Sequence, residues 1–339
     1  GGSTRGWAPD GVPSLVSLEE DRGTRGSFLV PTMALYEGIK SLLPPSVVRY
    51  TAPMHFWQPG VTPLSTVMSV VAMSVGYITI VLGGQAVMRH LPAVPARVLK
   101  IPFFLHNVLL CLGSLLLLCL YLELEIPIIF KYGMHNSICE YRLYFDAEMF
   151  HIINYYFKYW EFADTLFLVL KKKKLLFLHV YHHMATAALC YSQIVNQTTL
   201  SWVIICLNLA VHVIMYGYYA LASIGVRCPW KQLVTTGQIV QFVIDVVVCI
   251  YGIYHHYVHL YAPWLPYVRY CHGEPAAAFS GLGILVSYLV LFIFFYRDTY
   301  KKAPKADKKT QSGAAVRPAN DRRLAAKPQR CHVLHDQVV

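Results

Sequence analysis

Residues 103–124 are FFLHNVLLCLGSLLLLCLYLEL, an apolar run of the length that crosses a lipid bilayer as a helix. Similar runs occupy about residues 64–88, 148–170, 175–193, 198–222, 232–256 and 278–296. Because a bilayer crossing needs about 20 mostly apolar residues, each run qualifies as a candidate span. The pattern predicts an all-α, polytopic membrane protein with seven transmembrane helices.

The composition excludes the main alternatives to a membrane protein. The chain has 339 residues, of which 56% are hydrophobic and only 14% are charged. Soluble domains are about 25% charged, so these charges are too few to cover a soluble globule of this length. Aromatic residues make up 14% of the chain, whereas disordered chains contain few aromatic residues.

The net charge of +11 is concentrated after the last apolar run. Residues 297–339 hold 11 Lys and Arg against 4 Asp and Glu, and we interpret them as a basic tail. We expect a polar tail at 1–27, a membrane domain at 28–296 in contact with lipid, and an amphipathic surface segment at 28–43. No nucleic-acid-binding motif accompanies the basic residues, so no nucleic-acid partner is expected.

The loop charges predict the orientation. With the basic tail in the cytosol, nine Lys and Arg fall in cytosolic loops and three in the opposite loops. The positive-inside rule then places the N-terminus in the lumen and the C-terminus in the cytosol. Cys139 and Cys271 both fall in lumenal loops, where an oxidising compartment favours a disulfide between them, although two free thiols remain an alternative.

Strongly polar side chains interrupt four of the predicted spans. They are Lys158, Glu161 and Asp164; His179, His182 and His183; Asn208, His212 and Tyr216; and Gln238, Gln241 and Asp245. At 1.5 Å per residue, most lie about 10–15 Å from the same end of their helices, so they should meet in one layer. Lys158 and Asp245, both about 20 Å in, could form an ion pair between helices. Buried ionisable groups in a membrane usually mark function, although a lone histidine can simply hydrogen-bond two helices.

Several functional classes could use such a layer. An H-x-x-H-H sequence suggests metal, but membrane di-iron enzymes use more histidine boxes than this layer supplies. A retinal protein needs a Schiff-base lysine in the last span, and residues 278–296 contain none. A transporter, or an acyl-CoA-binding membrane protein without chemistry, remains open.

Metal-free histidines can act as nucleophiles or general bases, with acids and amides orienting them. A basic rim borders the layer: Lys171, Lys172, Lys173, Lys174, Arg227 and Lys231. A site of this kind in an apolar slab suits a substrate with a polyanionic head and an apolar tail, such as acyl-CoA.

Four sequence boxes resemble those of the ELO family of very-long-chain fatty acid elongases, in a form similar to fungal members. K-x-x-E-x-x-D-T begins at Lys158, and H-x-x-H-H begins at His179. N-x-x-x-H-x-x-M-Y begins at Asn208, and T-x-x-Q-x-x-Q-F begins at Thr235. The boxes occur in the family's order, which makes the match specific.

The resemblance implies a 3-ketoacyl-CoA synthase of the endoplasmic reticulum membrane, with six helices around an acyl tunnel and one peripheral helix. Acyl-CoA and malonyl-CoA would condense with loss of CO₂ and CoA, and no cofactor or metal would be needed. His182 would carry the acyl group, assisted by His179, His183 and His212. The supporting residues would be Lys158, Glu161, Asp164, Asn208, Tyr216, Gln238 and Gln241.

Two other mechanisms remain open. The histidines could polarise the thioester without a covalent intermediate, or the Cys190 thiol could be the nucleophile. By resemblance we also expect contacts with the ketoreductase, dehydratase and enoyl reductase of the elongation cycle, and a possible homo-oligomer.

Overall fold

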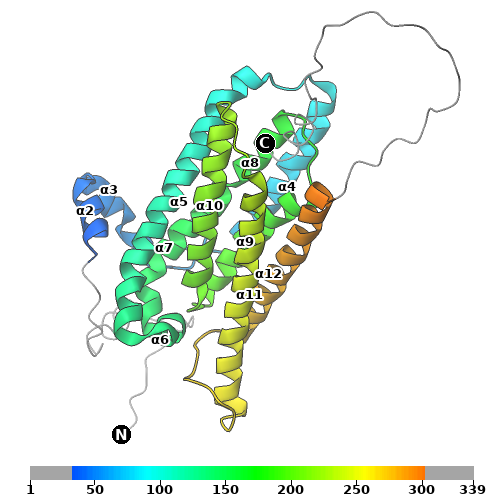
Figure 1. The fold of residues 1–339 in the computed structure, drawn as a ribbon. Coiled ribbons are helices and arrows are strands. Elements are labelled where there is room, and N and C mark those ends of the chain that lie inside the picture. Colours follow the sequence, from blue (N-terminus) through cyan, green and yellow to red (C-terminus); the bar gives the residue numbers. More distant parts are fainter. Residues whose placement is uncertain (1–32, 302–339) are drawn as a thin grey trace, which may run out of the picture. The chain divides into compact units, whose positions relative to one another are not determined.

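The computed structural model describes residues 33–301, and every regular element in that range is helical (Figure 1). The elements are α2 (Ala34–Leu42), α3 (Pro45–Thr51), η1 (Ala52–His55), α4 (Val67–His90), α5 (Ala96–Tyr132), α6 (Met134–Cys139), α7 (Tyr141–Trp160), α8 (Phe162–Leu170), α9 (Phe177–Val195), α10 (Ser201–Ser223), α11 (Lys231–Tyr261), α12 (Pro275–Tyr296) and η2 (Arg297–Lys301). The tail predicted at 1–27 and most of the tail predicted at 297–339 lie outside the described residues.

Five helices in the described range are long and apolar enough to cross a membrane: α4, α5, α10, α11, and Pro275–Lys301, which joins α12 to η2. The runs at 148–170 and 175–193, which we predicted as two further spans, are not in this group. The first of them is divided between α7 and α8 and contains Lys158, Glu161 and Asp164. The prediction of seven spans is therefore supported for five of them.

The division between α7 and α8 is a single tight turn at Glu161. The backbone N–H of Asp164 donates to the Glu161 carbonyl at 3.1 Å, a three-residue step in place of the four-residue step of an α-helix. The sequence pattern suggested one continuous helix here. The turn separates Lys158, at the end of α7, from Asp164, at the start of α8.

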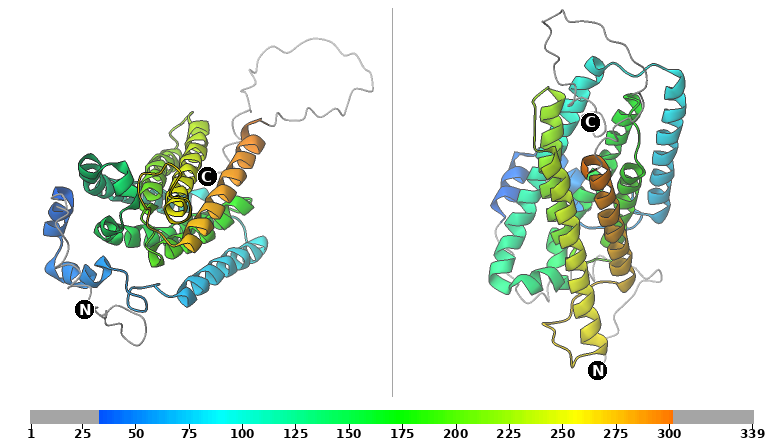
Figure 2. Two further views of the ribbon diagram at one scale, coloured as in Figure 1. Left: turned by 90° about the horizontal axis from the view of Figure 1, so that it is seen from below. Right: turned by 45° about the vertical axis from the view of Figure 1, so that its right-hand side comes forward.

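Six helices contact one another in a closed order. α5 packs on α10, α10 on α11, α11 on α12, α12 on α9, α9 on α7, and α7 again on α5. Both views in Figure 2 show α4 at the edge of this group, where it contacts α8 and α9. This arrangement gives the polar side chains of α7, α9, α10 and α11 a common interior.

Aromatic packing holds α4 against α8. The ring of Tyr77 stacks on that of Phe162 with centroids 4.2 Å apart, and Val81 and Val169 belong to the same buried cluster. The hydroxyl of Tyr77 also lies 2.8 Å from the hydroxyl of Thr165, so a polar contact fixes the register of the two helices.

Burial is distributed as expected for a protein in lipid. Lys158 and Glu161 are each 2% exposed and Asp245 is fully buried, whereas Val75 and Leu82 of α4 are each 59% exposed. A soluble protein rarely shows so much apolar side chain to water. Ionisable groups inside and aliphatic groups outside indicate a lipid environment.

A disulfide joins Cys139, at the end of α6, to Cys271, in the segment between α11 and α12. This is the pair predicted from the sequence, and it links positions separated by 132 residues. We name this end of the helices the disulfide end. The opposite end, where the four lysines 171–174 separate α8 from α9, is the lysine end.

The amphipathic segment predicted at 28–43 is described from residue 33, and α2 occupies most of that part. No residue of α2 is buried. The backbone N–H groups of Leu35 and Tyr36 donate to the carboxylate of Glu123 in α5, which caps the start of α2.

Candidate functional site

Glu161 is the centre of a buried charged cluster. Lys158 Nζ donates to Glu161 Oε1 at 2.8 Å and to Asn208 Oδ1 at 2.9 Å. His212 Nδ1 lies 3.3 Å from the same Glu161 oxygen, and His212 Nε2 lies 3.3 Å from Asn208 Nδ2. The turn after α7 is thereby fastened to α10, and the imidazole of His212 is held through both of its nitrogens.

The predicted ion pair between Lys158 and Asp245 is wrong. Lys158 is paired with Glu161 three residues along its own chain, as described above. Asp245 Oδ2 accepts from Gln241 Nε2 at 3.0 Å, and Asp245 Oδ1 has no hydrogen-bond partner within residues 33–301. Lys158 pairs with Glu161 because Glu161 is already within reach on the same chain segment. A pair between Lys158 and Asp245 would have to span the space between two helices.

Asp164 lies at the junction of three helices. Its Oδ2 accepts from the Tyr216 hydroxyl of α10 at 2.8 Å, and its Oδ1 lies 2.8 Å from His106 Nε2 of α5. His106 Nδ1 accepts from the indole N–H of Trp160 at 3.2 Å. Sequence reasoning missed His106, although a lone histidine near the lysine end of the run 103–124 was a usable signal.

The H-x-x-H-H sequence presents its histidines from one turn of α9. His179 Nε2 lies 3.0 Å from the Thr165 hydroxyl of α8, and the His179 and His183 rings have centroids 4.5 Å apart. His183 Nδ1 is buried without a hydrogen-bond partner in the described part of the chain. All three histidines line the same cavity.

His182 lies among aromatic rings. Its ring centroid is 4.7 Å from that of Tyr288, 6.0 Å from Phe292 and 6.4 Å from Phe242. Its backbone carbonyl accepts from the Thr186 hydroxyl at 2.6 Å and from the Tyr288 hydroxyl at 3.3 Å. These contacts fix the helix turn that presents His182. Neither Thr186 nor Tyr288 belongs to the four sequence boxes.

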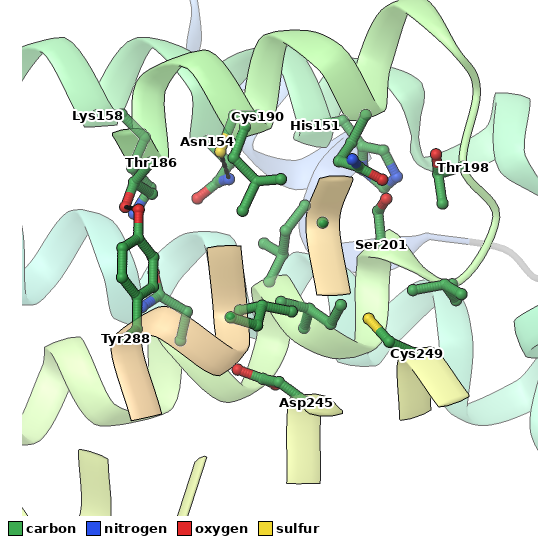
Figure 3. Close-up of a pocket in the computed structure, with 18 of the residues that line it drawn as sticks. His151, Asn154, Lys158, Thr186, Cys190, Thr198, Ser201, Asp245, Cys249 and Tyr288 are labelled. Atoms are coloured by element: carbon green, nitrogen blue, oxygen red, sulfur yellow. Dashed lines mark hydrogen bonds between the residues drawn. The ribbon is translucent and has the colours of Figure 1, made fainter. Parts of the chain in front are cut away.

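Two cavities meet at His182. The first has a volume of about 80 Å³ and extends toward the disulfide end, where Thr198, Ser201 and Cys249 line it (Figure 3). The second has a volume of about 160 Å³ and extends toward the lysine end. The residues that line both are His182, Asn208, Gln241 and Phe242.

The second cavity brings together almost all the site residues predicted from the sequence. They are Glu161, Asp164, His179, His182, His183, Asn208, His212, Tyr216, Gln238 and Gln241. Lys158 lines the first cavity instead. Gln238 Nε2 also lies 3.3 Å from the sulfur of Met215.

The predicted basic rim divides into two groups. Lys174 and Lys231 line the second cavity, whereas Lys171, Lys172, Lys173 and Arg227 line neither cavity. Lys171 Nζ lies 3.7 Å above the ring of Phe103, a cation–π contact. Partial burial and the nearby charge of Lys173 lower the pKa of Lys171.

Comparison with known proteins identifies the family. The sequence model of the ELO family, described as the GNS1/SUR4 family, matches residues 62–308. The chain is 44% identical over 269 residues to "Putative fatty acid elongase 1" of Schizosaccharomyces pombe, covering 79% of each protein. It is 36% identical over 261 residues to "Fatty acid elongase A" of Dictyostelium discoideum, covering 75% of this chain and 91% of the relative.

A more distant match is "Very long chain fatty acid elongase 5" of Mus musculus, which is 33% identical over 201 residues, or 56% of this chain and 62% of the relative. The family match contains all four sequence boxes and both cavities described above. The chain is a member of the ELO (GNS1/SUR4) family.

Proposed function

We propose that this protein is a condensing enzyme of fatty acid elongation, which joins an acyl-CoA to malonyl-CoA and releases a 3-ketoacyl-CoA, CO₂ and CoA. The relatives named as elongases support a role in fatty acid elongation. The observation that carries the proposal is the position of His182, a potential nucleophile where two cavities meet.

The two cavities suit the two parts of an acyl-CoA. The first is lined largely by aliphatic side chains, including Leu189, Ile204 and Leu285, and would receive the acyl chain. The second is lined by Lys174 and Lys231 near its lysine end, and their positive charges would attract the phosphates of CoA. A thioester held between the two would place its carbonyl carbon beside His182.

The first half-reaction in this proposal makes an acyl-histidine. A neutral His182 nitrogen attacks the thioester carbonyl, and the carbon–sulfur bond breaks as the CoA thiolate leaves with a proton. Nearby groups assist from fixed positions. His183 and the amides of Asn208 and Gln241, which line the second cavity, are the candidates to hold the developing oxyanion.

The second half-reaction forms the new carbon–carbon bond. Malonyl-CoA would enter the second cavity after CoA has left, and its loss of CO₂ would give an enolate that attacks the acyl carbon. The carbon–nitrogen bond to His182 then breaks, and the departing nitrogen takes up the one proton that the condensation consumes overall, which restores the neutral imidazole. His212, held by Glu161 and Asn208, is placed to stabilise the enolate.

We further propose that the protein lies in the endoplasmic reticulum membrane with its lysine end toward the cytosol, where CoA esters are available. The disulfide at the opposite end supports a lumenal position for that end, since disulfides persist in oxidising compartments. α7 with α8, and α9, would complete a set of seven spanning helices, with the six in closed contact enclosing the acyl chain.

Microsomes that contain the full chain, supplied with radiolabelled malonyl-CoA and a panel of acyl-CoAs, test this function. We expect labelled 3-ketoacyl-CoA from the wild type, its loss in His182→Ala, and its retention in Cys190→Ala, because Cys190 lines the first cavity and takes no part in the two proposed half-reactions. If the wild type binds acyl-CoA and yields no labelled product, the chain is a binding protein or transporter and the proposal fails.

A further inference from the structure

Thr165 is the middle member of a buried chain of three polar groups. Its hydroxyl oxygen lies 2.8 Å from the hydroxyl of Tyr77 in α4 and 3.0 Å from His179 Nε2 in α9. Thr165 is fully buried and Tyr77 is 4% exposed, and neither hydroxyl has another hydrogen-bond partner within residues 33–301. Both hydroxyl hydrogens must therefore be used inside the chain of three, because an unpaired hydroxyl in a buried position is costly.

One arrangement of the hydrogens satisfies both hydroxyl groups. In it, Tyr77 donates to Thr165, and Thr165 donates to His179 Nε2. If His179 Nε2 carried a hydrogen and donated it to Thr165, one of the two hydroxyl groups would keep its own hydrogen without an acceptor. One unpaired buried group disfavours that alternative about 5- to 150-fold. A neutral imidazole that accepts at Nε2 carries its hydrogen on Nδ1, so the chain of three fixes the tautomer of His179.

The nitrogen that carries this hydrogen is open to the second cavity. His179 lines that cavity. Its Nδ1 has no hydrogen-bond partner in the described part of the chain, and it does not belong to the unpaired side-chain atoms that the protein encloses. An Nδ1–H in this position can donate to an oxygen atom of a molecule in the cavity. It has no lone pair with which to accept a proton.

Resting on the function proposed above, we propose that His179 is a hydrogen-bond donor to the thioester carbonyl oxygen of malonyl-CoA, and that Thr165 is the positioning residue that sets this role. When the bond to the carboxylate carbon breaks and CO₂ leaves, the electron pair of that bond moves onto the thioester carbonyl oxygen. A donor that is already in place stabilises the negative charge as it develops. His179 is thereby a donor in the reaction and not its general base.

Asparagine and aspartate at position 179 distinguish a donor from a base. The side-chain nitrogen of asparagine is as many bonds from Cα as His179 Nδ1 and can donate, whereas an ionised aspartate oxygen at that place only accepts. We expect His179→Ala to lower kcat about 100- to 1,000-fold with little change in the KM for malonyl-CoA. His179→Asn should recover about tenfold or more of that loss, and His179→Asp none. Recovery in His179→Asp without recovery in His179→Asn would overturn the inference.

The tautomer is measured without substrate, by nitrogen-15 NMR of the full-length, histidine-labelled protein. The His179 signals are those that disappear in His179→Asn. We expect the Nδ1–H form in the wild type and in Thr165→Ser, which keeps the hydroxyl. Thr165→Val removes the hydroxyl at nearly constant volume, so it should give a mixture of tautomers and lower kcat about fivefold or more.

Thr62→Val is the matched control for the loss of a buried threonine hydroxyl. Thr62 is 4% exposed, its hydroxyl oxygen accepts from the Gln58 backbone N–H at 2.9 Å, and it lines neither cavity. The variant should keep the wild-type tautomer of His179 and the wild-type kcat. If Thr165→Val does not fold, the wild-type NMR signal and the His179 substitutions still test the inference.

The outcomes separate this inference from the proposed function. An Nε2–H or imidazolium signal from His179 in the wild type would overturn the inference, while condensation by the wild type would leave the function standing. An Nδ1–H signal that depends on Thr165, in a wild type that forms no labelled 3-ketoacyl-CoA, would support the control of His179 by Thr165 and refute the function.

Discussion

Glu161 shows how single residues organise the site. Its carboxylate is 2% exposed and meets two nitrogen donors, Lys158 Nζ and His212 Nδ1, from two different helices. A buried ion pair contributes little beyond its own desolvation cost, but a buried charge that loses its partner is strongly destabilising. The contacts of Glu161 with Lys158 and with His212 together specify where the turn after α7 must lie against α10.

Lys158→Met should lower the stability of the protein by about 3–5 kcal/mol, because it leaves the Glu161 carboxylate buried with a weaker partner. Thermal unfolding in detergent measures the change. Lys100→Met is the control, since Lys100 is exposed and should shift the unfolding temperature little. Equal unfolding temperatures for Lys158→Met and the wild type would show that Lys158 does not neutralise Glu161.

Sequence reasoning found the residues of the site better than their contacts. Helical spacing and depth were enough to predict that His182, His212 and Gln241 share a layer, and all three line the second cavity. The same reasoning wrongly paired Lys158 with Asp245, whereas Lys158 pairs with Glu161. The depth of a residue along a helix does not show which way its side chain points around the helix axis. His106 was missed because no polar residue lies three or four positions from it, so the histidine itself was the signal and no periodic pattern accompanied it.

At the level of elements, close approach between helices depends on small residues. A methyl group added at Gly113 of α5 would lie 2.9 Å from the Phe157 ring of α7, which is too close without movement. A methyl group at Gly217 of α10 would lie 3.6 Å from Cys111 Sγ of α5, an ordinary contact. The contact of α5 with α7 is therefore tighter at this level than its contact with α10.

Gly217→Ala should stabilise the protein by about 0.5–1 kcal/mol, because alanine is the better helix former and has room. Gly113→Ala gains the same helical term but should lose about 1–3 kcal/mol to overpacking against Phe157. Thermal unfolding of the two variants side by side measures the difference. Higher stability in Gly113→Ala than in Gly217→Ala would contradict this packing.

Helix ends were the least predictable feature of the elements. The run 103–124 was a reliable sign of a helix, but α5 extends from Ala96 to Tyr132 and contains Pro102 and Pro127. Apolar composition shows which residues must be helical inside the lipid. It does not show how far the helix continues outside the bilayer. The turn at Glu161 could not be predicted from the sequence either. No helix-breaking residue marks it, and what accompanies it is the buried ion pair between Lys158 and Glu161.

At the level of the whole molecule, the disulfide between Cys139 and Cys271 closes a long covalent loop. Cys139 and Cys271 are 132 residues apart, and the loop between them contains α7 to α11 and hence nearly all of the site. Cross-links over long loops restrict the unfolded chain strongly. This pairing was predictable because topology alone placed both cysteines at the same end.

Replacement of both cysteines by alanine should cost about 2–5 kcal/mol of stability, and reduction of the wild type should have the same effect. Unfolding temperatures with and without a reductant measure it. Cys228→Ala is the control, because that thiol is free and the variant should keep the wild-type response to reductant. A wild type that is indifferent to reductant would contradict a stabilising role for the bond.

The central claim is that His182, at the meeting point of the two cavities, carries the acyl group between the half-reactions. Intact mass spectrometry of the purified protein after incubation with acyl-CoA alone tests it most directly. We predict a mass increase of one acyl group in the wild type and in Cys190→Ala, and none in His182→Ala. Absence of an adduct in the wild type, or an adduct that survives His182→Ala, would contradict the claim.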